Sequence, residues 1–422
     1  MSLQQNQRGR WNRGGRPWRG TGRAGRGRGT GLGRGHHEGN GALPTPTAPP
    51  QQPLGLVVDT IDLHALLVEL DEPEIQSQCY VASYNWINGR DPVIIVPGSP
   101  PAWTPLAEDK KLKPDSEDVY RDINAARYPK YPMEPAVRSV LAMSPDFELA
   151  SLDIVGCGST IGNLLTFAGS QPRAFRFDVN VVGGTVFLIR RGNSPTEIID
   201  GLQGYGHTFP ENYTTWDAEV RNSCSHQRII QYDFGGLQIL IRTETDGYLK
   251  PATPKMSSKA SDTEANRSLE NALDEIAVST QSPPNHGKLE IKMGGEVVHQ
   301  SSIFDIKTRA GYKPYNMEEI LPRLWTNQTS KFLLAYHEFG LFDKPGVTSV
   351  AEDILKWQKA NSSLLARFHA LLKRIVDVVT GTKHTEFEIS WDGQGPLCIT
   401  KQIGEGRTAL PSDLVNLWDI NE

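Results

Sequence analysis

The chain has 422 residues, of which 38% are hydrophobic and 22% charged, and its formal net charge is −5. This length can support more than one small core, and the absence of any run of about 18 apolar residues argues against a membrane-spanning helix. The four cysteines lie far apart and form no Cys-x-x-Cys pair. We therefore expect neither a zinc site nor a disulfide framework, and a reducing compartment fits best.

The charge is unevenly distributed along the chain. Residues 1–40 contain nine arginines and one acid and carry a charge of +8, whereas the remainder carries −13. Residues 1–55 are low in complexity, rich first in Arg and Gly and then in Pro, and are predicted to be disordered. Arginine-glycine repeats interleaved with Trp11 and Trp18 favour loose RNA binding, because guanidinium groups meet phosphates and rings stack on bases. The alternative is a solubilising or protein-binding tail.

From residue 56 onward the pattern is that of one globular domain, 56–422. Apolar residues recur at helical spacing in 133–143 and 160–168. Three β-hairpins are then predicted from pairs of glycines that interrupt alternating apolar runs. Their turns are Gly183-Gly184, Gly235-Gly236 and Gly294-Gly295.

The second half of the chain adds helices to these hairpins. Residues 317–342 predict a helix leading into a strand, 350–381 predict one long amphipathic helix or two, and 385–401 predict a last hairpin. The polar stretch 251–285 is predicted to be a disordered insertion, since loops of that length are unusual inside a domain. Hairpins with flanking helices predict an α+β fold built on a mixed or antiparallel sheet.

Two carboxylates end an apolar strand in the segment "QILIRTETDGYL". Positions two apart in a strand point to the same side, so Glu244 and Asp246 would repel each other and lose hydration. A divalent cation removes both costs, and carboxylate oxygens suit Mg²⁺ or Mn²⁺. The alternative is a strand that reaches solvent at an Asp-Gly turn.

A second acid lies beside a base downstream. In "FDIKT", Asp305 and Lys307 share one face of a predicted strand. Carboxylates that hold metal ions, together with a lysine that orients water or offsets negative charge, are what metal-dependent phosphodiester hydrolysis requires. Glu290 and Lys292 form a second acid-x-Lys pair, which ranks lower because it lies on the first arm of the third predicted hairpin. On the helix that follows, the Gln328 amide could contact a nucleotide or a metal-bound water, or could simply be exposed.

The order of these motifs is that of a known family. "GYGHTFPE" (204–211), "ETD" (244–246), "DIK" (305–307), "WTNQ" (325–328) and "SWDGQGPLCIT" (390–400) follow one another in the chain. Over about residues 79–400 the chain resembles the DXO family of RNA 5′-end decapping nucleases. The resemblance implies a two-sheet α+β core related to the PD-(D/E)xK nucleases. It also implies metal-dependent removal of incomplete, unmethylated or nicotinamide-nucleotide caps, 5′-end degradation of RNA by some members, and stabilisation of a nuclear 5′–3′ exoribonuclease by others.

The chain departs from the family pattern at three positions. Gly158 stands where the family carries an arginine, for which Arg127 is a candidate replacement or else a buried structural residue. The glutamate of the first motif falls near Pro210 or Glu211, and because proline cannot bind a metal, Glu211 would have to act from a shifted register. Asp305 replaces a glutamate and is one methylene shorter. These departures predict altered or reduced activity.

The leading hypothesis is a metal-dependent RNA 5′-end hydrolase of the nucleus, with the cytoplasm as a further location. It uses Mg²⁺ or Mn²⁺ bound by Glu211, Glu244, Asp246 and Asp305, water assistance by Lys307, and RNA positioning by Gln328. The alternative is a catalytically impaired relative that binds RNA or an exoribonuclease partner. A DNA nuclease of the same broad fold ranks third, because the arginine-glycine tail favours flexible RNA.

Overall fold

The computed structural model describes residues 52–89, 91–116, 119–120, 122–192, 197–199, 204–251, 287–404 and 406–418. Apart from residues 52–55 and 251, the predicted tail and the predicted insertion lie outside these ranges. The described residues belong to one compact unit, Ala48–Glu422. Among them, no helix is both long and apolar enough to cross a bilayer.

Two of the predicted hairpins form the centre of the larger sheet. β7 (Phe175–Val182) turns into β8 (Thr185–Arg190), and β11 (Ser223–Phe234) turns into β12 (Leu237–Glu244). The glycine pairs between them have positive φ, +52° and +89° in the first turn and +62° and +91° in the second. These values are those of the tight turns that match strand twist and that glycine adopts without strain, so both predictions are confirmed.

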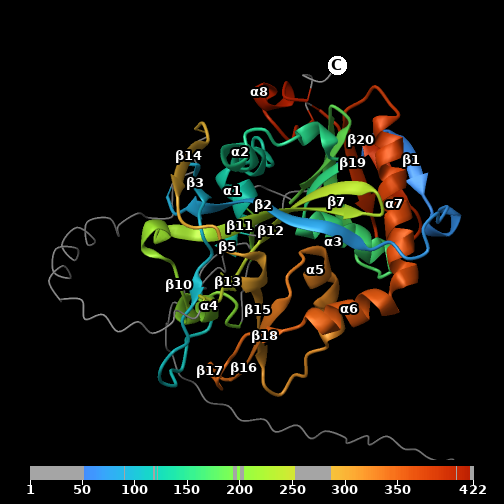
Figure 1. The fold of residues 1–422 in the computed structure, drawn as a ribbon. Helices are drawn as coiled ribbons and strands as arrows, with labels where there is room; N and C mark the ends of the chain where they lie inside the picture. Colours follow the sequence, from blue (N-terminus) through green and yellow to red (C-terminus); the bar gives the residue numbers. More distant parts are fainter. Residues whose placement is uncertain are drawn as a thin grey trace, which may run out of the picture. The chain divides into compact units, whose positions relative to one another are not determined.

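The larger sheet has eleven strands in the order β1-β20-β19-β7-β8-β6-β12-β11-β2-β3-β14 (Figure 1). The last predicted hairpin, β19 to β20, is confirmed within it. The sheet is mixed, because β6 runs parallel to both β12 and β8 while most other pairs are antiparallel. Its remaining strands are β1 (Val57–Ile61), β2 (Ile75–Ile87), β3 (Val93–Pro97), β6 (Ile154–Cys157), β14 (Glu290–Gly294), β19 (Glu386–Trp391) and β20 (Leu397–Lys401).

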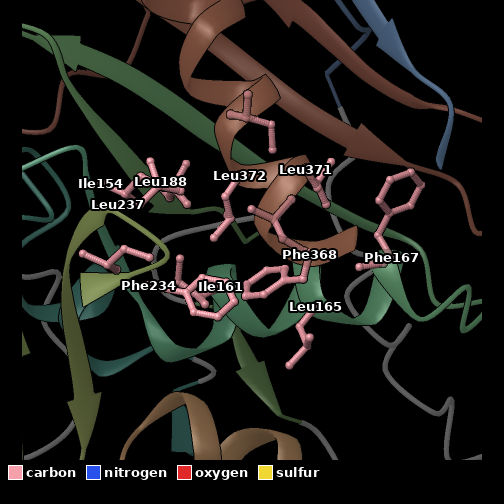
Figure 2. Packing of buried hydrophobic residues seen from close by; sticks show 14 of the residues in the cluster. Ile154, Ile161, Leu165, Phe167, Leu188, Phe234, Leu237, Phe368, Leu371 and Leu372 are labelled. Atoms are coloured by element: carbon pink, nitrogen blue, oxygen red, sulfur yellow. The ribbon is translucent and has the colours of Figure 1, made fainter. Parts of the chain in front are cut away.

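Helices cover both faces of this sheet. Ile239 and Ile241 of β12 pack with α3 (Gly158–Ala168) and α7 (Ser362–Thr380), whereas Leu240 packs with α2 (Glu134–Met143) on the other face. Figure 2 shows the first of these cores, in which aromatic and aliphatic side chains of α3, α7 and the sheet interlock. The region 350–381 forms two helices, α6 (Ala351–Ala360) and α7, which meet at Asn361.

The second sheet has seven strands and carries helices on opposite faces. Its order is β10-β4-β13-β15-β16-β17, with β18 pairing β16. Phe304 of β15 packs with α4 (Thr208–Tyr213), while Phe332 of β16 packs on the other side with Leu324 of α5 (Leu321–Thr326). The strands are β4 (Ala102–Trp103), β10 (Thr214–Thr215), β13 (Gly247–Tyr248), β15 (Ile303–Ala310), β16 (Lys331–Glu338), β17 (Leu341–Phe342) and β18 (Thr348–Ser349). Outside the two sheets lie the short ladder of β5 (Val119–Tyr120) with β9 (Ile198–Ile199), the helices α1 (Ile123–Arg127) and α8 (Ser412–Val415), and 3-10 turns at Leu63–Ala65, Leu149–Ser151, Ala218–Val220, Gln300–Ser302 and Met317–Glu319.

The third predicted hairpin is wrong. β14 pairs in parallel with β3 in the larger sheet, while β15 belongs to the second sheet. Gly295 adopts φ +77°, and a Cβ there would lie 2.6 Å from the Gly98 carbonyl carbon, so the glycine serves a close backbone approach instead of a hairpin turn. Glu290 and Lys292 are consequently exposed on an edge strand, 3.4 Å apart, and on a different sheet from Asp305.

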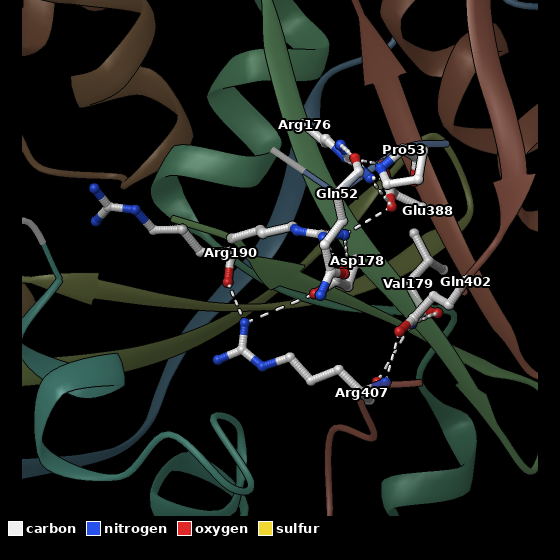
Figure 3. Close-up of polar contacts among 10 residues, drawn as sticks. Gln52, Pro53, Arg176, Asp178, Val179, Arg190, Glu388, Gln402 and Arg407 are labelled. Carbon is white, nitrogen blue, oxygen red and sulfur yellow. Dashed lines mark hydrogen bonds and ion pairs between the residues drawn. The ribbon is translucent and has the colours of Figure 1, made fainter. Parts of the chain in front are cut away.

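An arginine-carboxylate network fixes the far half of the larger sheet (Figure 3). Arg191 pairs with Asp178 at 2.9 Å and with Glu388 at 2.7 Å, which links β7 to β19. Arg407 donates a hydrogen bond to the Arg190 carbonyl at 2.9 Å.

The two mixed sheets and the helices that flank them confirm the predicted α+β fold on a mixed or antiparallel two-sheet core.

Candidate active site

The predicted acid pair lies where the chain leaves one sheet and enters the other. β12 ends at Glu244 in the larger sheet, and β13 begins at Gly247 in the second. Asp246 therefore lies on the link between the two sheets, two residues beyond the end of the strand, and not inside a continuous strand as the alternation predicts. The Glu244 side chain is reached by solvent, yet desolvation by the surrounding protein raises the pKa of its carboxyl.

Strand register brings Asp246 beside Asp305. β13 pairs antiparallel with β15 so that Gly247 faces Phe304, which makes the two aspartates neighbours across the ladder. The backbone N–H of Ile306 donates to Asp246 Oδ2 at 2.7 Å. Desolvation and the nearby Asp305 carboxylate together raise the pKa of Asp246 to about 7.

Arg323 is a part of this site that the sequence analysis missed. It reaches from α5, with its Nη2 3.0 Å from Oδ2 of Asp305. Asp305 is only 2% exposed, and its Oδ2 has no hydrogen-bond partner. The negative charge of Asp305 raises the pKa of Arg323 above its usual value, and Asp246 and Glu244 contribute smaller effects in the same direction. One cation of the protein itself thus faces all three acids.

The donor chemistry of this site fits a divalent cation. Asp246 lies beside Asp305 and is influenced by the charge of Glu244, and carboxylate oxygens are the ligands that Mg²⁺, Mn²⁺ and Ca²⁺ prefer. Within the described ranges, however, no set of three or more His, Cys, Asp or Glu side chains is already arranged to hold a metal ion. In this structure Oδ2 of Asp305 is instead paired with Nη2 of Arg323 at 3.0 Å.

The structure places Lys307 two residues beyond Asp305 on β15, on the same face and exposed. Gln328 lies past the end of α5, not on it, with φ +51°. The side-chain amide nitrogen of Gln328 donates to the Trp325 backbone carbonyl. The backbone carbonyl of Gln328 accepts a hydrogen bond from the Gln300 side-chain amide at 3.0 Å. The side chain of Gln328 therefore points back toward the last turn of α5.

Glu211 is not brought together with the other acids. It lies on α4, whose Phe209 and Tyr213 pack with Phe304. Because neighbouring residues of a strand point to opposite faces, Asp305 points away from α4 and toward α5. The carboxylate of Asp115 accepts backbone N–H groups of residues 206–208 at the start of this helix, and although burial opposes the effect, these hydrogen bonds lower the pKa of Asp115. The segment "GYGHTFPE" thus has a structural partner in Asp115.

Gly158, the position of the expected arginine, lies at the first turn of α3 beside the end of β12. A Cβ at this glycine would lie 2.8 Å from Asn327 Oδ1 and 3.6 Å from Thr243 Cγ2. Asn327 is 5% exposed, and its Oδ1 has no hydrogen-bond partner. Asn327, and not Gln328, is therefore the amide that faces the start of α3.

Arg127 does not replace the missing arginine at this position. It ends α1, where it donates to the Gly89 carbonyl and, at 3.2 Å, to Asn88 Oδ1. Its Nη2 also lies 3.8 Å from the thiol of Cys224. These partners give it a structural role in the described part of the chain.

Comparisons with known proteins identify a family for this chain and solved structures with a similar fold. Residues 74–387 match the family model described as "Domain of unknown function (DUF8563)", and the chain belongs to that family. A search of curated proteins found no match. Among solved structures, the Schizosaccharomyces pombe protein Rai1 ("S. pombe Rai1") matches with a TM-score of 0.53 at 13% identity, covering 82% of this chain and 99% of that one.

A second yeast protein gives the same result. Rai1 of Scheffersomyces stipitis, solved in complex with (3'-NADP)+ and calcium ion, matches with a TM-score of 0.55 at 10% identity, covering 88% of this chain and 99% of that one. A further S. pombe Rai1 structure contains 3'-FADP and matches with a TM-score of 0.53 at 13% identity, covering 82% and 99%. The predicted resemblance to RAI-like proteins of the DXO family is therefore confirmed at the level of the fold.

Proposed function

We propose that this protein is a metal-dependent RNA 5′-end hydrolase that removes incomplete or nicotinamide-nucleotide caps. The observation that carries this proposal is the meeting of Asp246 and Asp305 across the β13–β15 ladder, with Glu244 at the end of β12. The same fold in S. pombe and S. stipitis Rai1, solved with 3'-FADP and with (3'-NADP)+ and calcium ion, supports a dinucleotide-like cap as the substrate class.

Each residue then has a definite task. Glu244, Asp246 and Asp305 would hold the divalent cation, Mg²⁺ or Mn²⁺, and when bound the ion supplies charge stabilisation at the phosphorus and an activated water. Lys307, exposed on the Asp305 face of β15, offsets negative charge on the phosphate. The resemblance also supports a nuclear location and a 5′–3′ exoribonuclease partner as parts of this proposal, together with 5′–3′ degradation of RNA.

The test is cap hydrolysis by the purified chain. RNA carrying a nicotinamide-nucleotide cap or a 5′-triphosphate is incubated with Mg²⁺ or Mn²⁺, and the released products are separated. We expect product to disappear with EDTA and in Asp246→Asn, and to persist in Asp377→Asn, which removes the same charge from an exposed position on α7. Hydrolysis that survives Asp246→Asn would contradict the proposal.

The second candidate function is RNA binding without catalysis. The ion pair of Arg323 with Asp305 and the filling of the Gly158 position by Asn327 are the observations that favour it. In the same assay it predicts that labelled RNA is retained by the protein and recovered intact with either metal.

A further inference from the structure

We propose that Arg323 is a built-in competitor of the divalent cation, occupying the carboxylate site in the metal-free protein and lowering its affinity for the ion. This inference rests on the proposed function, because it concerns the ion that the three acids would hold. Arg323 would then help to set the concentration of divalent cation at which the site binds the ion.

The first step is the state of Asp305. It is 2% exposed, and Oδ2 has no hydrogen-bond donor. A buried carboxylate without a counter-charge is strongly unfavourable, so an opposite charge is needed. Nη2 of Arg323, at 3.0 Å, supplies that charge. A metal ion that binds Oδ2 must first break this ion pair.

The second step is the position of the guanidinium relative to the other acids. Its charge acts on Asp246 and Glu244 as well as on Asp305. A single arginine therefore neutralises part of the charge that would attract an ion, and it repels any cation that approaches while it remains in place.

The third step is that Arg323 can leave. Its side chain is 50% exposed, unlike that of Asp305 at 3%. In the described part of the chain, its one ion pair is the contact with Asp305. A long, half-exposed side chain can rotate into water without disturbing α5, so Arg323 would be able to release Asp305 to a bound ion.

The experiment measures Mn²⁺ binding by titration calorimetry and by the electron spin resonance signal of free Mn²⁺. Wild type is compared with Arg323→Met, Arg323→Gln and the control Arg374→Met. Arg374 is also 50% exposed and also forms one ion pair, with Asp59, but on α7. We expect affinity to rise at least about tenfold in both Arg323 variants, since a competing charge is removed, and to stay unchanged in Arg374→Met.

The melting temperatures of the same variants provide a second measurement that does not depend on activity. In EDTA the Arg323 variants should melt below wild type, because three carboxylates lose their counter-charge, and Mn²⁺ should raise their melting temperature more than that of wild type. Adding Asp246→Asn to Arg323→Met should abolish the gain in affinity. Should Arg323→Met misfold, Arg323→Gln keeps a polar side chain and gives the same comparison.

Equal, weaker or undetectable Mn²⁺ binding in the Arg323 variants overturns the inference. The proposed function is judged separately by cap hydrolysis. If wild type hydrolyses capped RNA while the variants show no gain in affinity, this inference fails and the function stands. If the variants gain affinity through Asp246 but no form hydrolyses RNA, the function fails and the inference stands.

Discussion

Asn327 occupies the space into which an arginine at position 158 would extend. The expected arginine is absent at position 158, and a Cβ there would lie 2.8 Å from Asn327 Oδ1, so a larger residue would require the Asn327 side chain to move. The departure at Gly158 and the orientation of Asn327 are thus parts of one local arrangement at the start of α3. Asp305 differs in kind, since its shorter side chain already has a cationic partner in Arg323.

His226 should make the stability of the protein sensitive to mild acid. It is 1% exposed, its Nδ1 lies 2.6 Å from Asn85 Oδ1, and burial holds its pKa well below the usual range. The unfolded chain takes up a proton near pH 6.5 that the folded chain does not, so stability falls as pH drops below that value. The slope from this group is up to about 1.4 kcal/mol per pH unit.

Urea unfolding between pH 5 and 7.5 checks this expectation. His226→Asn should lower stability at pH 7.5 but flatten its decline toward pH 5. The exposed His64→Asn should leave the wild-type profile unchanged. A variant profile parallel to that of wild type would show that His226 titrates alike in both states.

At the scale of the elements, the β13–β15 contact sets the spacing of the two aspartates. Gly247 begins β13, and a Cβ there would lie 2.6 Å from Phe304 Cζ and 3.2 Å from the Pro101 carbonyl oxygen. Only a residue without a side chain allows β13 to pair with β15 at this distance.

We therefore expect Gly247→Ala to cost about 1–3 kcal/mol and to reduce cap hydrolysis more than the loss of folded protein explains. Gly162→Ala on α3 is the matched control. Apart from its chain neighbours and the backbone of its own helix, no atom lies within 4 Å of the added Cβ, and replacing a helical glycine should stabilise by about 0.5–1 kcal/mol. Denaturant unfolding and initial rates measure the two effects. Unchanged hydrolysis in a correctly folded Gly247→Ala would show that the strand spacing tolerates displacement.

The elements also show how far the sequence could predict the structure. Gly183-Gly184 and Gly235-Gly236 were predictable as turns because turn chemistry is local. Gly294-Gly295 has the same local pattern, but Gly295 packs against Gly98, almost two hundred residues earlier, which no neighbouring residue indicates. Glu244, Asp246 and Asp305 could be proposed from strand alternation and motif order. Arg323 could not, because its contact with Asp305 depends on how α5 packs over the second sheet.

At the scale of the whole molecule, the charge distribution predicts a role for the tail. Residues 1–40 carry +8 and the remainder −13. Deleting residues 1–40 should weaken RNA affinity and flatten its dependence on salt, because fewer phosphates are neutralised and fewer counterions released. Fluorescence anisotropy at several salt concentrations measures both quantities, with a full-length variant in which the nine tail arginines are replaced by glutamine as control. An unchanged salt slope would remove the tail from RNA recognition.

The link from Glu244 to Gly247 has a consequence for how this site can change. The three acids are divided between two separately packed cores, with Asp246 on the connection. A small shift of one sheet against the other alters the gap between Glu244 and Asp305 without replacing either. Substitutions deep in either core can therefore change the spacing of these acids, while every acidic residue stays in place.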